Sequence, residues 1–161
     1  MDKNKIKLYR RKIEGKTDYK KRLLLLKSRK LRLVIRKSLR NVQLQLVNYA
    51  ANGDKILFSS HSNQLKKFGW KQHNGNLSSA YLTGLIFGLK AKSRNVKEAV
   101  LDLGLSRAVK GSVLYAALKG ATATETGLSI PHSKEILPVE KRIESKEGFK
   151  EVKEKILKEK W

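Results

Sequence analysis

The sequence predicts a mixed α/β domain, in which helices pack on a sheet that begins as a three-stranded antiparallel meander. Two kinds of periodicity support this prediction: apolar and polar residues alternate in segments such as 41–47, and apolar residues recur at helical spacing in 76–92. The main elements follow the order strand, strand, strand, helix, strand, helix, which places helices against a mixed sheet. A length of 161 residues suits one such domain with extensions.

Composition divides the chain into three parts. Residues 1–16 form a basic arm that carries seven Lys/Arg and few apolar residues, so we expect it to become ordered only on a partner. A tail that only keeps the protein soluble is the alternative. Residues 17–139 form the globular body, and residues 140–161 form a C-terminal helical extension.

Capping residues mark the ends of several predicted helices. Helices are predicted at 17–27, 62–68, 76–92, 112–124 and 141–161. Asp18 can cap the first of them, which should tie the arm to the body, and Gly69 is the expected stop of the second. Gly84 and Gly88 form a pair of small residues that predicts a close approach between the third helix and a strand. The last helix is amphipathic, and its predicted inward stripe is Phe149, Val152, Ile156 and Leu157.

Four strands are predicted at 31–36, 41–47, 55–59 and 98–103. In the second strand, Val42, Leu44 and Leu46 alternate with polar residues, so one face is apolar and the other can meet solvent or RNA. The turn signal Asn52-Gly53-Asp54 connects the second and third strands, which favours an antiparallel meander.

The charge is concentrated near the N-terminus. Of a net charge of +23, the first forty residues hold 17 Lys/Arg against three acidic residues, whereas residues 120–161 hold nine against eight. Lysine and arginine that neutralise phosphates release counterions, so a nucleic acid explains this gradient best. A membrane surface would also require an apolar helix face or a lipid anchor, which the first sixteen residues lack. We therefore expect no membrane partner.

Several chemistries are excluded by composition. The absence of cysteine rules out disulfides, thiolate metal sites and cysteine nucleophiles. No segment has the roughly 18 apolar residues of a membrane span, and no apolar run near the N-terminus could serve as a signal peptide. These observations predict a cytosolic protein.

Catalytic groups are scarce. Between residues 31 and 119 the only carboxylates are Asp54, Glu98 and Asp102, so a two-metal nuclease would lack its cluster of acids. The three histidines lie far apart, without the spacing of a zinc site. The loop 69–76 has neither phosphate-binding nor dinucleotide spacing, but its small and basic residues suit contact with a phosphate backbone. Within it, Trp70 is interpreted as a core anchor, with base stacking as the alternative.

The segment TDYKKRLLLLKS at 17–28, preceded by basic residues, resembles the archaeal and eukaryotic form of the large-subunit ribosomal protein eighteen family. The resemblance continues in the same order through RLVIRKS at 32–38, LKKFGWK at 65–71, AYLTGL at 80–85, EAVLDLGL at 98–105, KGSVLYAALKGA at 110–121 and GLSIPH at 127–132. It implies a body of ribonuclease-H-like topology without ribonuclease chemistry. It also implies a structural role: binding 5S ribosomal RNA and attaching it to the large-subunit RNA in the central protuberance.

The same resemblance implies a set of RNA-binding residues at the matching positions. In the arm, first helix and first strand these are Arg10, Arg11, Lys16, Thr17, Tyr19, Arg22, Lys27, Ser28, Arg32, Arg36 and Ser38. Before the two main helices they are Lys71, Asn76, Lys110, Gly111 and Ser112. Charged groups would meet phosphates, whereas hydroxyl and amide groups could hydrogen-bond phosphate or 2′-OH groups.

We therefore predict a noncatalytic protein of the cytoplasmic ribosome that needs no cofactor or metal. Its expected partners are 5S rRNA, large-subunit rRNA and neighbouring large-subunit proteins of the central protuberance. An RNA-processing nuclease is the main alternative, and a metal-dependence test of RNA cleavage would separate the two. A general nucleic-acid-binding protein is a further alternative, which predicts similar affinity for any duplex.

Overall fold

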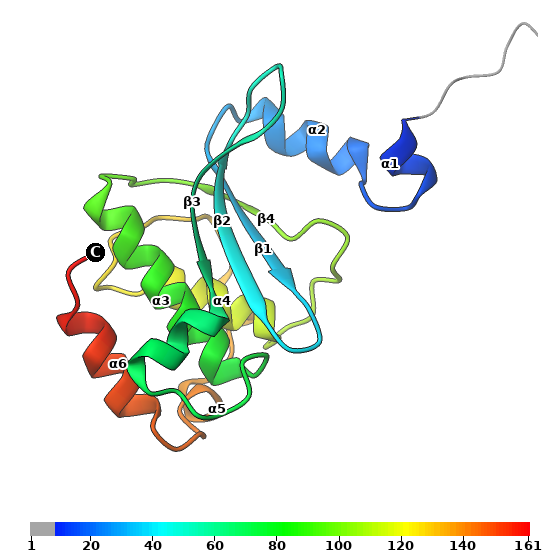
Figure 1. Ribbon diagram of the computed structural model, residues 1–161. Coiled ribbons are helices and arrows are strands. Elements are labelled where there is room, and N and C mark those ends of the chain that lie inside the picture. The colour runs from blue at the N-terminus through cyan, green and yellow to red at the C-terminus, as the bar shows by residue number, and fades with distance from the viewer. Residues whose placement is uncertain (1–8) are drawn as a thin grey trace, which may run out of the picture.

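The computed structural model describes residues 9–161, so the first eight residues of the predicted arm lie outside the described part (Figure 1). The strands are β1 (Arg32–Lys37), β2 (Val42–Asn48), β3 (Lys55–His61) and β4 (Val100–Asp102). The α-helices are α1 (Arg10–Ile13), α2 (Tyr19–Lys27), α3 (Leu77–Ser93), α4 (Val113–Ala121), α5 (Glu140–Ile143) and α6 (Phe149–Lys158). Two 3₁₀ helices are η1 (Ser62–Phe68) and η2 (Lys134–Ile136). Among the described residues, none of the helices is long and apolar enough to cross a membrane.

The sheet has the order β3-β2-β1-β4. Strands β1, β2 and β3 form an antiparallel meander, and β4 pairs in parallel with β1. The predicted α/β class with a mixed sheet is confirmed. Just before β4, Glu98 forms an isolated parallel β-bridge with Ser129.

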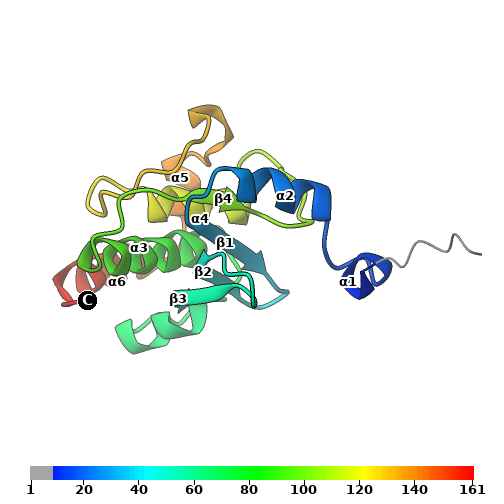
Figure 2. The same ribbon diagram turned by 90° about the horizontal axis from the view of Figure 1, so that it is seen from above.

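The two faces of the sheet have different environments. Leu33, Ile35 and Leu44 are fully buried beneath the helices, because alternate side chains of a strand point to the same face. Helices α3 and α4 lie on this side, whereas α1 and α2 lie on the other (Figure 2). The second face is therefore left for the arm and for a partner.

Local capping positions the helices, at Asp18 and Gly69 as predicted and at Asn76 in addition. The Asp18 carboxylate accepts a hydrogen bond from the backbone N–H of Lys21 at the start of α2, and the Asn76 side chain does the same for Ser79 at the start of α3. Gly69 ends η1 in the left-handed conformation, with a φ of 89°.

The closest approach in the core joins two helices, not a helix and a strand. A Cβ atom at Gly84 of α3 would overlap the carbonyl oxygen of Ala117 and lie 2.9 Å from the backbone nitrogen of Ala121, both in α4. Gly120 of α4 meets the backbone of Tyr81 in the same way. The predicted partner of Gly84 was therefore wrong: the small residues let α3 and α4 pack backbone against backbone.

The C-terminal extension is two helices and not one. Gly148, with a φ of 77°, breaks the predicted helix between α5 and α6. Phe149, Val152 and Ile156 are buried as predicted, and they form a second core with Trp70, which confirms Trp70 as a core anchor. Leu157 is 39% exposed, so its predicted inward position was wrong. The extension belongs to the packed body.

Candidate nucleic-acid interface

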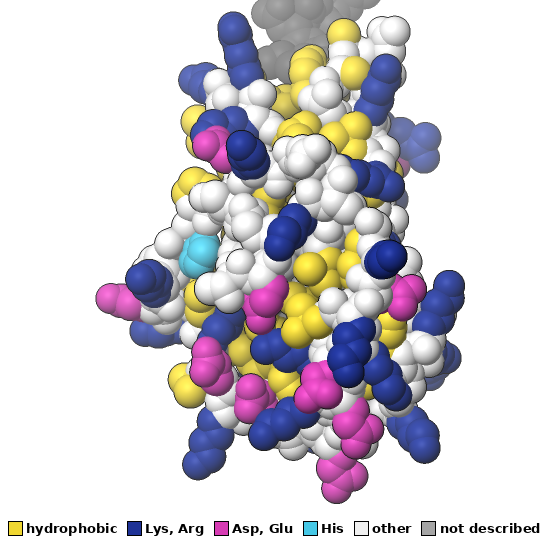
Figure 3. All heavy atoms as spheres, turned by 90° about the vertical axis from the view of Figure 1, so that its left-hand side faces the viewer, with side chains coloured by type: hydrophobic (Ala, Val, Ile, Leu, Met, Phe, Trp, Pro, Cys, Tyr) yellow, Lys and Arg dark blue, Asp and Glu magenta, His cyan; other side chains and the backbone are white. Residues whose placement is uncertain are grey.

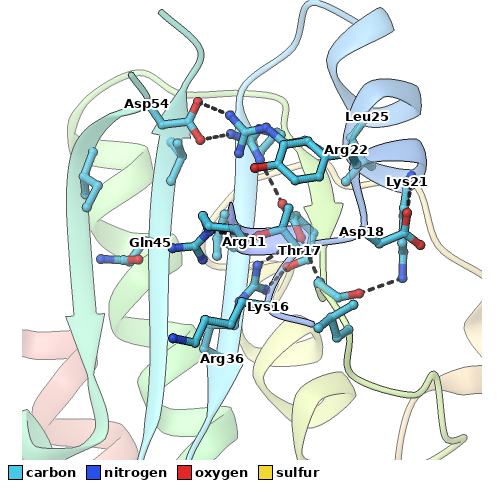
Figure 4. A pocket seen from close by; sticks show the side chains of 18 residues that line it. Arg11, Lys16, Thr17, Asp18, Lys21, Arg22, Leu25, Arg36, Gln45 and Asp54 are labelled. Carbon is cyan, nitrogen blue, oxygen red and sulfur yellow. Dashed lines mark hydrogen bonds and ion pairs between the residues drawn. The ribbon is translucent and has the colours of Figure 1, made fainter. Parts of the chain in front are cut away.

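The sheet face opposite α3 and α4 carries an alternating set of polar, charged and apolar side chains. Strand register brings Arg32 beside Val47, Val34 beside Gln45, and Arg36 beside Gln43. Helix α2 and the end of the arm lie over part of this face and leave a cleft of about 550 Å³ between them and the sheet, which we call the arm cleft (Figure 4).

The arm cleft is predominantly cationic. Six Lys/Arg line it against three aspartates: Arg11, Lys16, Lys21, Arg22, Arg32 and Arg36 against Asp18, Asp54 and Asp102. These nine charged residues come from the arm, α2, β1, the β2–β3 turn and β4. Segments that are distant in the sequence therefore build one positive surface.

A chain of alternating charges, which we call the ion chain, crosses this site: Arg22, Asp54, Arg32, Asp102 and Arg36. Asp54 accepts hydrogen bonds from Arg22 at 2.9 Å and from Arg32 at 2.6 Å (Figure 4). Asp102 accepts from Arg32 at 2.9 Å and from Arg36 at 3.2 Å. The ion chain thus links α2, the β2–β3 turn, β1 and β4.

The position of Arg32 differs from its predicted role. Its side chain is only 3% exposed, and its two terminal nitrogens donate to Asp54 and Asp102. A guanidinium that is buried and paired in this way cannot meet a phosphate without breaking the pairs. We therefore replace the predicted RNA contact of Arg32 with a structural role in holding the interface together.

Arg36 occupies the exposed end of the ion chain. Its side chain is 45% exposed, and it also donates to the carbonyl oxygens of Ile35 and Asp102. Gly104 lies against the Arg36 guanidinium, and Lys21 of α2 donates to the Gly104 carbonyl at 3.0 Å. Arg36 is therefore held in place while nearly half of its side chain remains exposed to a partner.

The described end of the arm is folded, although the sequence predicted order only on a partner. Residues 10–13 form a helical turn, and the ring of Tyr9 stacks on that of Tyr19 with centroids 4.8 Å apart. Arg11 donates to the Thr17 hydroxyl at 3.0 Å. These contacts join residues 9–16 to the start of α2.

The remaining predicted RNA-binding residues differ in whether their polar groups are free to contact RNA. Arg10, Lys27, Lys71 and Lys110 are exposed, although Arg10 pairs with Glu14. The hydroxyl and amide groups of Ser28, Ser38 and Asn76 all make hydrogen bonds within the fold. Gly111 and Ser112 are partly buried before α4, and the Ser112 hydroxyl has no hydrogen-bond partner among the described residues.

The cleft also contains residues that the sequence prediction omitted. The sequence indicated Gln45 only as part of the polar side of β2, and Asp54 and Asp102 only as isolated acids, and Lys21 was not among the predicted RNA-binding residues. The one available signal was Asp102, because a carboxylate inside a predicted strand requires a buried partner. Within residues 9–161 the structure holds no group of three His, Cys, Asp or Glu residues that could bind a metal.

Acid is expected to weaken the attachment of α2. Burial alone would raise the pKa of Asp54, but hydrogen bonds and charge from Arg22 and Arg32 lower it below the ordinary value of 3.8. A carboxylate with a lowered folded pKa stabilises the fold above its ordinary pKa, and this contribution is lost as the pH falls through the folded pKa. Wild type should therefore unfold at a higher denaturant concentration than Asp54→Asn at about pH 6, and the difference between them should be smaller at about pH 2.5, below the ordinary pKa of Asp54. An equal difference at both pH values would contradict the ion chain.

Comparisons with known proteins show which family the chain belongs to. A family model described as ribosomal large subunit proteins 60S L5 and 50S L18 matches residues 3–96, which include the arm, α2, the meander and α3. The large ribosomal subunit protein uL18 of Methanococcus maripaludis is 54% identical over 135 residues, covering 84% of this chain and 69% of the relative. The chain belongs to this ribosomal protein family.

Membership in the L18 family confirms the predicted resemblance. Proteins of the family are structural constituents of the large ribosomal subunit and are not enzymes, so the nuclease alternative is set aside. The chain accordingly has its place in the large subunit of the cytoplasmic ribosome. The cationic sheet face is then the natural candidate for contact with ribosomal RNA.

Proposed function

We propose that this protein binds 5S rRNA and attaches it to large-subunit rRNA in the central protuberance. The observation that carries the proposal is the arm cleft, where six Lys/Arg against three carboxylates gather on a sheet face that no core helix covers. A folded polyanion is the partner that such a surface fits.

The contacts follow from exposure and charge. Arg11, Lys16 and Arg36 border the cleft and would neutralise phosphates there. Beyond it, the exposed cations Lys27, Lys71 and Lys110 would extend the contact along the backbone. Thr17 and Tyr19, which also line the cleft, would contribute hydrogen bonds and packing.

The opposite side of the molecule suits other partners. Figure 3 shows Lys/Arg and Asp/Glu side chains interspersed around apolar groups on the face that is turned left in Figure 1. The exposed side of α6 contributes Lys150, Glu151 and Glu154 to this balanced surface. We propose that neighbouring large-subunit proteins, and not RNA, contact this side.

Crosslinking in cells, followed by sequencing of the attached RNA, tests the proposal. The expected result is enrichment of 5S rRNA together with one or a few segments of large-subunit rRNA. Crosslinked peptides should come from the arm, α2 and β1. Enrichment of large-subunit rRNA without 5S rRNA would contradict the proposed partner, although the protein would remain ribosomal.

A further inference from the structure

We propose that the arm cleft receives a single unpaired nucleotide of the bound RNA, an inference that rests on the proposed function. The base would lie on the sheet between β1, β2 and α2, and its phosphate would face the cations at the rim. The bound RNA would thus be read at one base in addition to its backbone.

The size of the cleft favours one nucleotide over a helix. Its volume of about 550 Å³ lies in the range of about 300 to 1,000 Å³ that is typical of small-ligand sites. An RNA duplex has to remain outside such a space and can offer it only phosphates. An unstacked nucleotide can enter, and sequence-specific RNA recognition usually targets such splayed bases.

The floor of the cleft suits the flat apolar face of a base. Val34 of β1 and Val47 of β2 line it at diagonal positions of the two strands, and Ile56 pairs with Val47 on β3. Leu25 of α2 and Leu105 complete the apolar lining. Ile56 and Leu105 are each more than half exposed, so apolar surface stays open beside the cations.

One polar group on this floor makes no hydrogen bond with the described residues. The Gln45 amide lies next to Val34, is partly buried, and makes no hydrogen bond among residues 9–161. An amide offers both a donor and an acceptor, so it can pair with the edge of a nucleobase. Gln45 therefore supplies the direct readout that the cationic rim lacks.

The charged residues around the cleft suit the phosphate of the same nucleotide. Arg11 and Lys16 from the arm and Arg36 from β1 border the same cleft and suit its phosphate. Asp54 and Asp102 are already paired with arginines in the ion chain, so they repel an anion less than free carboxylates would. The bonds from Arg22 to Asp54 and from Lys21 to Gly104 hold α2 above the sheet, so the cleft is formed before RNA arrives.

Chemical probing of 5S rRNA in complex with the full-length protein tests this inference. The probes are dimethyl sulfate for adenine and cytosine and a carbodiimide for guanine and uracil, which modify the pairing edges of unpaired bases. Wild-type protein should protect one unpaired nucleotide that Gln45→Ala leaves reactive. Affinity should fall by roughly tenfold in Gln45→Ala, in keeping with the loss of a base-edge contact.

Gln43→Ala is the matched control, because Gln43 lies on the same strand and the same face but outside the cleft. It should retain the protection and change the affinity less than about twofold. The inference is overturned if Gln45→Ala retains the protection, whether or not its affinity falls, or if both variants behave alike. In those cases 5S rRNA binding itself still stands, whereas failure of the wild-type protein to bind 5S rRNA would overturn the proposed function.

Discussion

Replacing Gly84 with alanine is expected to destabilise the protein by about 3 kcal/mol or more. The added methyl group would overlap the Ala117 carbonyl, and a backbone atom of a packed helix cannot move aside as the end of a side chain can. Helices α3 and α4 would have to separate, which would open the core above the sheet. Chemical denaturation followed by circular dichroism measures the loss.

Gly127→Ala provides the control for this substitution. Gly127 has a φ of 68°, and a Cβ atom there would have no neighbour within 4 Å, so alanine should cost only about 1 kcal/mol through backbone strain. The additional loss of unfolding free energy in Gly84→Ala, compared with Gly127→Ala, measures the effect of the contact between α3 and α4. Equal losses in the two variants would show that the helices can accommodate a methyl group at their crossing.

Deletion of residues 1–16 is expected to weaken 5S rRNA binding by at least about 100-fold at about 0.15 M salt. The deleted segment carries seven Lys/Arg, and each phosphate contact that is lost removes a released counterion. The slope of log K against log salt should therefore fall by roughly 3 to 6. Fluorescence anisotropy over a series of salt concentrations measures both quantities.

A matched pair of charge variants separates the arm from net charge. Replacing Arg10, Arg11 and Lys16 by glutamine should reproduce part of the loss in affinity and slope. Three exposed lysines of α6 can be replaced by glutamine in the same way: Lys150, Lys155 and Lys158. This variant loses the same amount of charge from the side of the molecule with balanced charges, so its RNA binding should change little. Similar losses in the two triple variants would indicate a general charge effect without a defined interface.

Local sequence signals predicted the elements well. The alternation in β2, the cap at Asp18 and the glycine stop at Gly69 each act over a few residues, so the pattern contains the cause of the structure. Gly148 shows the limit of this approach, because the helix predicted over 141–161 contained a glycine that separates α5 from α6. Leu157 was misplaced because it belongs to the apolar pattern but lies past the edge of the packed stripe.

The candidate site depended on contacts that no local pattern contains. Arg32 resembles any exposed arginine at the start of a strand, yet its partners lie 22 and 70 residues away at Asp54 and Asp102. In the same way, the small residue Gly84 predicted a close approach, but the sequence did not show which element would approach it. Charge predicted the kind of partner, but the arm cleft arises only when the arm, α2 and the sheet come together.

We propose above that the arm and the open sheet face recognise folded 5S rRNA. Competition between two nucleic acids is the most direct test of this recognition. Labelled 5S rRNA bound to the full-length protein at about 0.15 M salt is challenged with unlabelled 5S rRNA or with a DNA duplex at equal phosphate concentration. Unlabelled 5S rRNA should displace the label, and the duplex should do so only at far higher concentration, because A-form grooves, 2′-OH groups and unpaired bases offer contacts that B-form DNA lacks. Equal displacement by the two competitors would contradict this recognition and would indicate a general nucleic-acid-binding protein.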